Sequence, residues 1–118
     1  MDSVLDFKHL SQVFIVCGRT DLRKGIDGLA AVVQEEYDLN PFAPALFLFC
    51  GVRRDRFKAL YWEGDGFLLL YKRFENGHLQ WPRSREDIME LTTKQLRWLL
   101  SGMSIESTVR PAKIGNLY

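Results

Sequence analysis

The sequence predicts an α+β fold, in which a four-stranded antiparallel meander packs against two helices. Three observations predict it. Short runs of β-branched and aromatic residues are separated by Gly, Asn and Asp turns. Apolar residues recur at helical spacing in two segments. A chain of 118 residues is long enough to bury one core. We expect a single domain over residues 1–103 and a C-terminal tail over 104–118, where no periodicity is visible.

The first expected strand is the run Val-Phe-Ile-Val-Cys at 13–17, which Gly18 closes and which can join the meander as a fifth strand. A helix is expected at about 21–37, capped by Thr20 or Asp21. One apolar stripe supports it, formed by Leu22, Ile26, Leu29, Ala30, Val33 and Tyr37. Gly25 and Gly28 weaken its first turns, since each costs about 1 kcal/mol of helix propensity relative to Ala.

The meander itself is expected as strands at 46–50, 56–63, 67–74 and 78–81, joined by turns at 51–55, 64–66 and 76–77. The last turn, Asn-Gly, is the strongest short hairpin signal, and Pro82 ends the ladder. A second helix is expected at about 92–102, opened by Thr92 or Thr93. Its apolar face would consist of Leu96, Leu99, Leu100 and Met103.

Composition and motifs exclude several classes of protein. No signal peptide or membrane span is visible, so we expect a cytoplasmic protein without membrane contact. Two cysteines, Cys17 and Cys50, are too few for a disulfide scaffold and are expected in the core. Cys and His occur singly, without metal-ligand spacing, and each carboxylate has a simple structural role. We therefore expect no enzyme activity, no cofactor and no metal site.

The charge is unevenly distributed along the chain. The formal net charge is +1, yet residues 53–85 hold eight basic and four acidic side chains among many aromatic ones. Basic residues interleaved with aromatic ones suit a nucleic-acid surface, because cations meet phosphates and rings stack on bases. An ordinary amphipathic sheet with its charges in solvent would have the same composition.

The turn at 64–66 leaves two strand registers open. A three-residue loop would place Lys58 opposite Lys72, and a two-residue loop would place Arg56 opposite Arg73. Like charges face each other in either case, which is unfavourable unless an anion lies between them or they splay into water. A two-residue turn at Asn76-Gly77 would set Lys72 across from Trp81. Trp98, on the second helix, either packs under the tail or presents a surface to a partner.

Several segments resemble the TnpB-type accessory proteins of insertion sequence 66 elements, which share only a name with RNA-guided nucleases. The resemblance covers about residues 12–103. It rests on Gly18–Ala30, Asn40-Pro41-Phe42, Leu46–Phe49, Arg53–Lys58, Tyr61–Phe67, Leu70–Arg73, Trp81-Pro82-Arg83 and the helix from Leu91-Thr92 to Leu99-Leu100. Gly25 departs from the serine expected in many relatives. The resemblance implies an accessory protein that acts beside a transposase encoded by the same element.

The basic residues supply a hypothesis for how such a protein acts. We expect DNA, at the element ends or the target, to contact a basic sheet face. The expected phosphate contacts are Arg53, Arg54, Arg56, Lys58, Lys72 and Arg73, with Trp62 and Trp81 beside them. Arg19, Arg23 and Lys24 at a helix start are further candidates. The alternative is a protein–protein adaptor that assembles or regulates the transposase without touching DNA.

Overall fold

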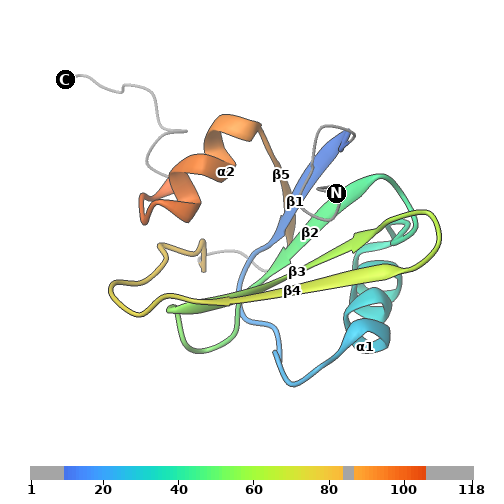
Figure 1. The fold of residues 1–118 in the computed structure, drawn as a ribbon, viewed down its shortest axis with the longest axis horizontal. Helices are drawn as coiled ribbons and strands as arrows, with labels where there is room; N and C mark the ends of the chain where they lie inside the picture. The colour runs from blue at the N-terminus through green and yellow to red at the C-terminus, as the bar shows by residue number, and fades with distance from the viewer. Residues whose placement is uncertain (1–9, 84–86, 106–118) are drawn as a thin grey trace.

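A computed structural model describes residues 10–83 and 87–105 of the chain, which form an α+β fold (Figure 1). The five strands of one mixed sheet lie in the order β4-β3-β2-β1-β5. Their bounds are Gln12–Val16 for β1, Ala45–Phe49 for β2, Arg56–Trp62 for β3, Phe67–Arg73 for β4 and Ile88–Leu91 for β5. The helical segments are α1 (Ile26–Ala31), η2 (Val32–Glu36) and α2 (Thr93–Leu100).

The sheet differs from the predicted meander at both ends. Strands β2, β3 and β4 do form consecutive antiparallel pairs, but β1 pairs parallel with β2 and lies inside the sheet. The expected strand at 78–81 is irregular, and the fifth strand is β5, which pairs antiparallel with β1. Alternation alone could not reveal β5, because it is only four residues long.

The first helix is shorter than the predicted range of 21–37. Asp21 accepts a hydrogen bond from the Arg23 amide at 3.0 Å, which holds residues 21–24 in a turn, and α1 starts after Gly25. Beyond α1 the chain widens into the π-helical turn η2. The predicted apolar stripe is confirmed, since Leu29 and Val33 are fully buried against the sheet.

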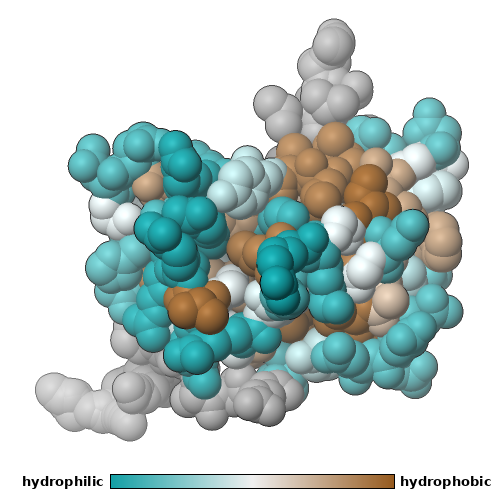
Figure 2. Space-filling view, turned by 90° about the horizontal axis from the view of Figure 1, so that it is seen from below, coloured by the Kyte–Doolittle hydropathy of each residue, from teal (hydrophilic) through white to brown (hydrophobic). Residues whose placement is uncertain are grey.

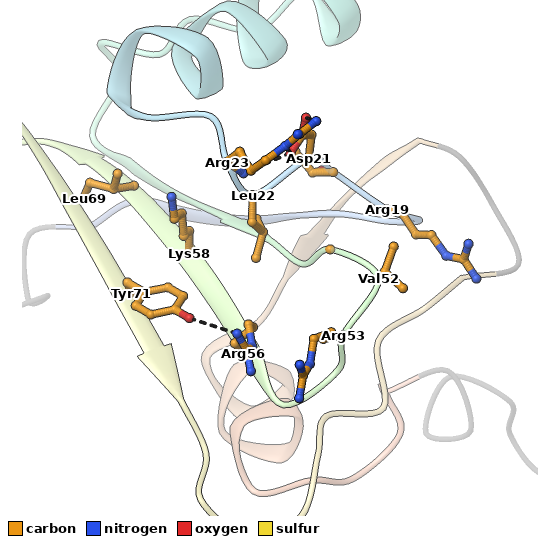
Figure 3. A pocket seen from close by; sticks show the side chains of 12 residues that line it. Arg19, Asp21, Leu22, Arg23, Val52, Arg53, Arg56, Lys58, Leu69 and Tyr71 are labelled. Atoms are coloured by element: carbon orange, nitrogen blue, oxygen red, sulfur yellow. Dashed lines mark hydrogen bonds and ion pairs between the residues drawn. The ribbon is translucent and has the colours of Figure 1, made fainter.

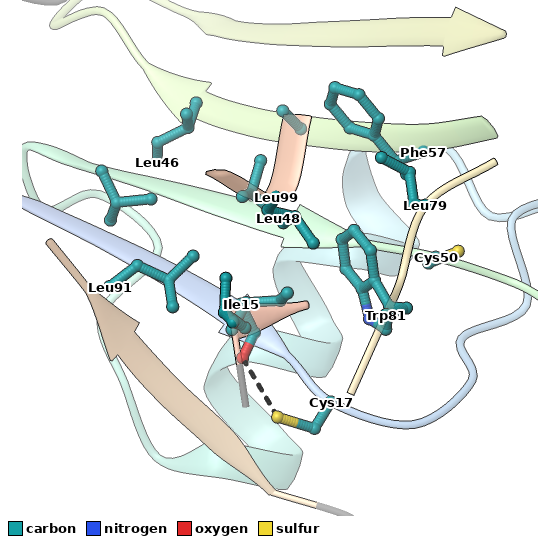
Figure 4. Packing of buried hydrophobic residues seen from close by; sticks show 13 residues of the cluster. Ile15, Cys17, Leu46, Leu48, Cys50, Phe57, Leu79, Trp81, Leu91 and Leu99 are labelled. Atoms are coloured by element: carbon teal, nitrogen blue, oxygen red, sulfur yellow. Dashed lines mark hydrogen bonds between the residues drawn. The ribbon is translucent and has the colours of Figure 1, made fainter. Parts of the chain in front are cut away.

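Two apolar clusters cover the two faces of the sheet. On the α1 side, Phe47, Phe49 and Leu60 pack against Leu29 and Val33. The other face is covered by α2 and the segment around residues 79–81 (Figure 4). All five residues of β2 are buried, as expected for a continuous apolar run in the middle of a sheet.

Trp81 belongs to the second cluster and is only 4% exposed. Its indole Nε1 donates to the Val16 carbonyl at 2.9 Å, and the Gly18 amide donates to the Pro82 carbonyl at 2.9 Å. These bonds tie the segment to the end of β1 instead of to β4. The prediction that Trp81 stands on a strand across from Lys72 is therefore wrong, because burial of the indole outweighs the hairpin signal.

The second helix begins at Thr92, which forms a capping box. Its hydroxyl accepts from the Gln95 amide at 3.0 Å, and the Gln95 side chain accepts from the Thr92 amide at 2.9 Å. The buried face of α2 differs from the predicted one. Leu99 is buried and Trp98 packs against the same cluster, whereas Leu100 and Met103 are 38% and 49% exposed.

The described part of the chain has no helix that is both long and apolar enough to cross a membrane. It ends on Ile105, which is fully buried in the cluster beneath α2. Most of the expected tail, residues 106–118, lies outside the described residues.

Replacing Trp81 by Phe should lower the free energy of unfolding by about 2–3 kcal/mol, because it leaves the buried Val16 carbonyl without its donor and opens a small cavity. Urea denaturation followed by circular dichroism measures the change. Trp62→Phe, at a partly exposed position, serves as the control. Equal losses in the two variants would contradict the anchoring role of Trp81.

Replacing Thr92 by Ala should cost about 1 kcal/mol, the usual value of an N-cap hydroxyl. Thr93→Ala is the matched control, because Thr93 is the next residue, is exposed and lies inside the helix. Thermal denaturation of both variants measures the difference. A larger loss for Thr93→Ala would mean that the helix starts one residue later.

Candidate nucleic-acid interface

An open groove of about 850 Å³ lies on the α1 side of the sheet, where β3 and β4 meet the loops after β1 and β2 (Figure 3). Five basic side chains line it: Arg19, Arg23, Arg53, Arg56 and Lys58. Four apolar or aromatic ones lie between them: Leu22, Val52, Leu69 and Tyr71. We refer to this feature as the basic groove. Seen from below in the orientation of Figure 1, the molecule likewise exposes hydrophobic surface between hydrophilic groups (Figure 2).

The β3–β4 hairpin decides which side chains reach the basic groove. The Glu63 amide donates to the Gly66 carbonyl at 2.9 Å, and Gly64 has a φ of +97°, so the turn has two residues. Arg56 therefore faces Arg73, which is the second of the two predicted registers, and Lys58 faces Tyr71. Because side chains alternate along a strand, all four lie on the α1 side, and three of them line the basic groove, whereas Arg73 does not.

Local carboxylates relieve the repulsion between Arg56 and Arg73. Arg56 donates to the two oxygens of Asp55 at 2.8 and 3.1 Å, and Arg73 donates to Glu75 at 3.2 and 3.3 Å. The guanidinium of Arg56 also approaches the Tyr71 hydroxyl, at 3.4 Å. Each arginine of the facing pair is thus held by a carboxylate of its own, which reduces the repulsion between them.

Lys58 connects the sheet to the loop before α1. Its Nζ donates to the Lys24 carbonyl at 3.0 Å and lies 6.0 Å from the centroid of the Tyr71 ring. The ammonium group thus lies over the ring of Tyr71, a residue that is 53% exposed. Such a pair presents a positive charge and a flat ring to the same ligand.

The acidic groups near the basic groove are already paired. Hydrogen bonds from Arg23, at 2.9 and 3.0 Å, lower the pKa of Asp21 to about 2, so this carboxylate stays ionised at any physiological pH. The Arg56 guanidinium likewise lowers the pKa of Asp55. Within residues 10–83 and 87–105, Arg19 makes no ion pair, and Arg53 has a loose one with Asp55 at 3.6 Å. These two arginines are the cations with most capacity for an external anion.

Arg83 holds the two loops of the basic groove together. It donates to the Gly18 carbonyl at 3.2 Å, to the Gly51 carbonyl at 2.6 Å and to the Cys50 sulfur at 3.7 Å. Burial lowers the pKa of Arg83 and raises that of the Cys50 thiol. Sequence reasoning missed this role, although Arg83 directly follows the Trp81-Pro82 pair that carries the family resemblance.

The structure separates the remaining predicted DNA contacts from the basic groove. Arg54 faces a second hollow of about 440 Å³ that it shares with Arg19, Arg83 and Glu36. The register puts Lys72 on the opposite face of the sheet, where its Nζ lies 5.0 Å from the Phe74 ring. The Lys24 side chain is exposed outside the lining.

The predicted tryptophans lie in three different places. Trp62 packs against Phe42 and Phe67, with ring centroids 5.0 and 4.9 Å apart, at the turn end of the hairpin. Trp81 is in the core, where its ring cannot stack on a base. Trp98 lies on α2 beneath Lys94, whose Nζ is 5.2 Å from the ring.

Residues 10–83 and 87–105 contain no group of three or more His, Cys, Asp or Glu side chains placed to hold a metal ion. His9 lies outside the described residues, and Cys17 and Cys50 are buried thiols.

Known proteins resemble the chain over most of its length. Residues 11–110 match the family described as IS66 Orf2-like protein. The protein y4hO of Sinorhizobium fredii is 36% identical over 107 residues, which cover 88% of this chain and 93% of y4hO. The protein y4jC of the same organism is 26% identical over 92 residues, covering 78% and 79% of the two chains. No solved structure matches the chain significantly. The chain belongs to the IS66 Orf2-like, or TnpB-type, family of accessory proteins of transposition.

Proposed function

We propose that this protein is a non-catalytic accessory factor that binds DNA through the basic groove and acts with the transposase of its element. The observation that carries the proposal is that five basic side chains from three separate segments line one groove together with apolar and aromatic side chains. Among the described residues that line it, Asp21 is the only acidic one. Family membership supports the transposition setting.

The composition of the basic groove suits a phosphate backbone with an accessible base or sugar. Arg19, Arg53 and Lys58 would neutralise phosphates, and each neutralised phosphate releases condensed counterions. The exposed Tyr71 ring, with Leu69 beside it, would offer a surface for stacking or apolar contact. Because the whole chain carries a net charge of only +1, long-range attraction to DNA is weak. The transposase would then supply part of the affinity and the sequence specificity.

Removing a groove cation should weaken DNA binding and flatten its salt dependence. Arg53→Ala and Lys58→Ala are each expected to reduce the slope of log K against log salt by about 0.9, the value for one phosphate contact. Fluorescence anisotropy with labelled element-end DNA, titrated at several salt concentrations, measures this slope.

Lys72→Ala is the matched control for these variants. It also removes one exposed cation from the same hairpin, but from the opposite face of the sheet. Its slope should equal that of the unmodified protein. Two results would refute binding through the basic groove. One is DNA binding that does not depend on salt in any variant, and the other is a reduction of the slope in Lys72→Ala as large as in Arg53→Ala and Lys58→Ala.

A second candidate function is that of an adaptor that holds the transposase through α2. The supporting observation is a shallow hollow lined by Lys94, Arg97, Trp98, Leu100 and Ser101. Leu100 is 38% exposed there, and Met103 at the end of the helix is 49% exposed. Large apolar side chains beside a tryptophan and two cations are typical of protein contact surfaces.

Two aspartate variants separate the two functions. Leu100→Asp should abolish co-purification with the transposase and leave DNA binding unchanged, because the change lies on α2. Val52→Asp, at a position 72% exposed in the basic groove, should do the reverse. Co-purification of tagged protein with transposase, and anisotropy with DNA alone, measure the two activities. If Leu100→Asp retains the transposase fully, the adaptor surface is not on α2.

A further inference from the structure

We propose that β4 pairs with β4 of a second copy of this chain, antiparallel about a two-fold axis at Leu70, to form one continuous sheet from two five-stranded halves. This inference concerns the edge of the sheet and does not depend on DNA binding. β4 is the outermost strand at its end of the sheet (Figure 1).

The hydrogen-bond pattern of the β3–β4 hairpin decides which N–H and C=O groups of β4 are free to bind a further strand. The Glu63 amide donates to the Gly66 carbonyl, and the Phe74 amide donates to the Asp55 carbonyl at 2.7 Å. Backbone groups of even-numbered residues in β4 therefore point toward β3. Those of Phe67, Leu69, Tyr71 and Arg73 point outward. No hydrogen bond within residues 10–83 and 87–105 uses these outward groups.

The side chains of β4 favour a partner at this edge. Its first five residues, Phe-Leu-Leu-Leu-Tyr, are apolar or aromatic, and the strand has neither a proline nor an inward-pointing charge among them. Natural proteins usually protect an exposed edge with such residues, because an unprotected one pairs with another chain. The two cations of β4, Lys72 and Arg73, stand at its end.

The position of these cations selects the antiparallel arrangement. In a parallel pair in register, Lys72 and Arg73 would face their own copies and repel each other. In an antiparallel pair centred on Leu70, Lys72 faces Leu68 and Arg73 faces Phe67 of the second copy. This register joins outward groups to outward groups, Phe67 with Arg73 and Leu69 with Tyr71, so the hydrogen bonding is self-complementary.

The pairing has a consequence for the basic groove. A two-fold axis between antiparallel strands is perpendicular to the sheet, so both α1 faces, and hence both grooves, lie on the same side. Leu69 and Tyr71 line the groove of one copy and would stand opposite Tyr71 and Leu69 of the other. The two grooves would become one surface.

A charge exchange at position 68 tests the proposal. The two-fold axis creates two contacts between position 68 of one copy and Lys72 of the other. Leu68→Lys would place like charges at both contacts, whereas Leu68→Glu would place opposite charges there. Both changes remove the same side chain from the monomer. We expect sedimentation equilibrium to give twice the 13.7 kDa chain mass for the unmodified protein and for Leu68→Glu. Dimerisation of Leu68→Lys should be about tenfold weaker.

The double variant Leu68→Lys/Lys72→Glu should restore the dimer, because it reinstates two opposite-charge pairs. Circular dichroism of each variant checks that the fold is retained. A monomeric unmodified protein, or equal dimerisation of Leu68→Lys and Leu68→Glu, would overturn the proposal. Either result would leave DNA binding by the basic groove intact, since a monomer can still show the salt slope measured above.

Discussion

The parallel pairing of β1 with β2 is the constraint on which the rest of the structure depends. Two parallel neighbours need a crossover, and residues 17–44 supply it with α1 and η2. The C-terminal ends of β1 and β2 then lie side by side at the same end of the strands. The loops that leave them meet there, where the Thr20 amide donates to the Cys50 carbonyl at 2.8 Å. The basic groove is built from these two loops and the hairpin beside them.

Close contact between the loops requires particular residues. A side chain at Gly51 would come within 3.2 Å of the Thr20 carbonyl and 3.3 Å of Leu22, so a glycine lets the backbones approach. Arg83 then bridges the carbonyls of Gly18 and Gly51 from a segment anchored by Trp81. These contacts fix the backbone of the two loops that carry the groove cations, although the groove itself is open to solvent.

The basic groove concentrates positive charge on a protein whose formal net charge is only +1. Asp21 and Asp55 pair locally with Arg23 and Arg56, which leaves Arg19 and Arg53 as its least compensated arginines. The same hairpin that carries Lys58 also presents the free edge of β4. A second copy at that edge would double the basic surface without adding any charge to the chain.

The sequence by itself determined the elements whose signals are local. It predicted the α+β class, the strands within 45–73, the apolar stripe through Leu29 and Val33, and the cap at Thr92 as one of two candidates. These depend on alternation, helical spacing and capping chemistry, which neighbouring residues carry. The five cations of the basic groove are among the nine that the sequence offered as candidate phosphate contacts, but the sequence did not separate these five from the other four.

Only the tertiary structure decided which of these residues lie together. The parallel partnership of β1 and β2 is a long-range pairing, and β5 is too short to show a period. By composition Trp81 cannot be told from an exposed tryptophan, yet its indole is buried in the apolar cluster, where Nε1 donates to the Val16 carbonyl. Lys72 and Arg73 are neighbours in sequence but lie on opposite faces, since a strand reverses its side chains at every residue. Arg83 bridges the loops of Gly18 and Gly51 from a third segment, and no local sequence pattern connects these three parts of the chain.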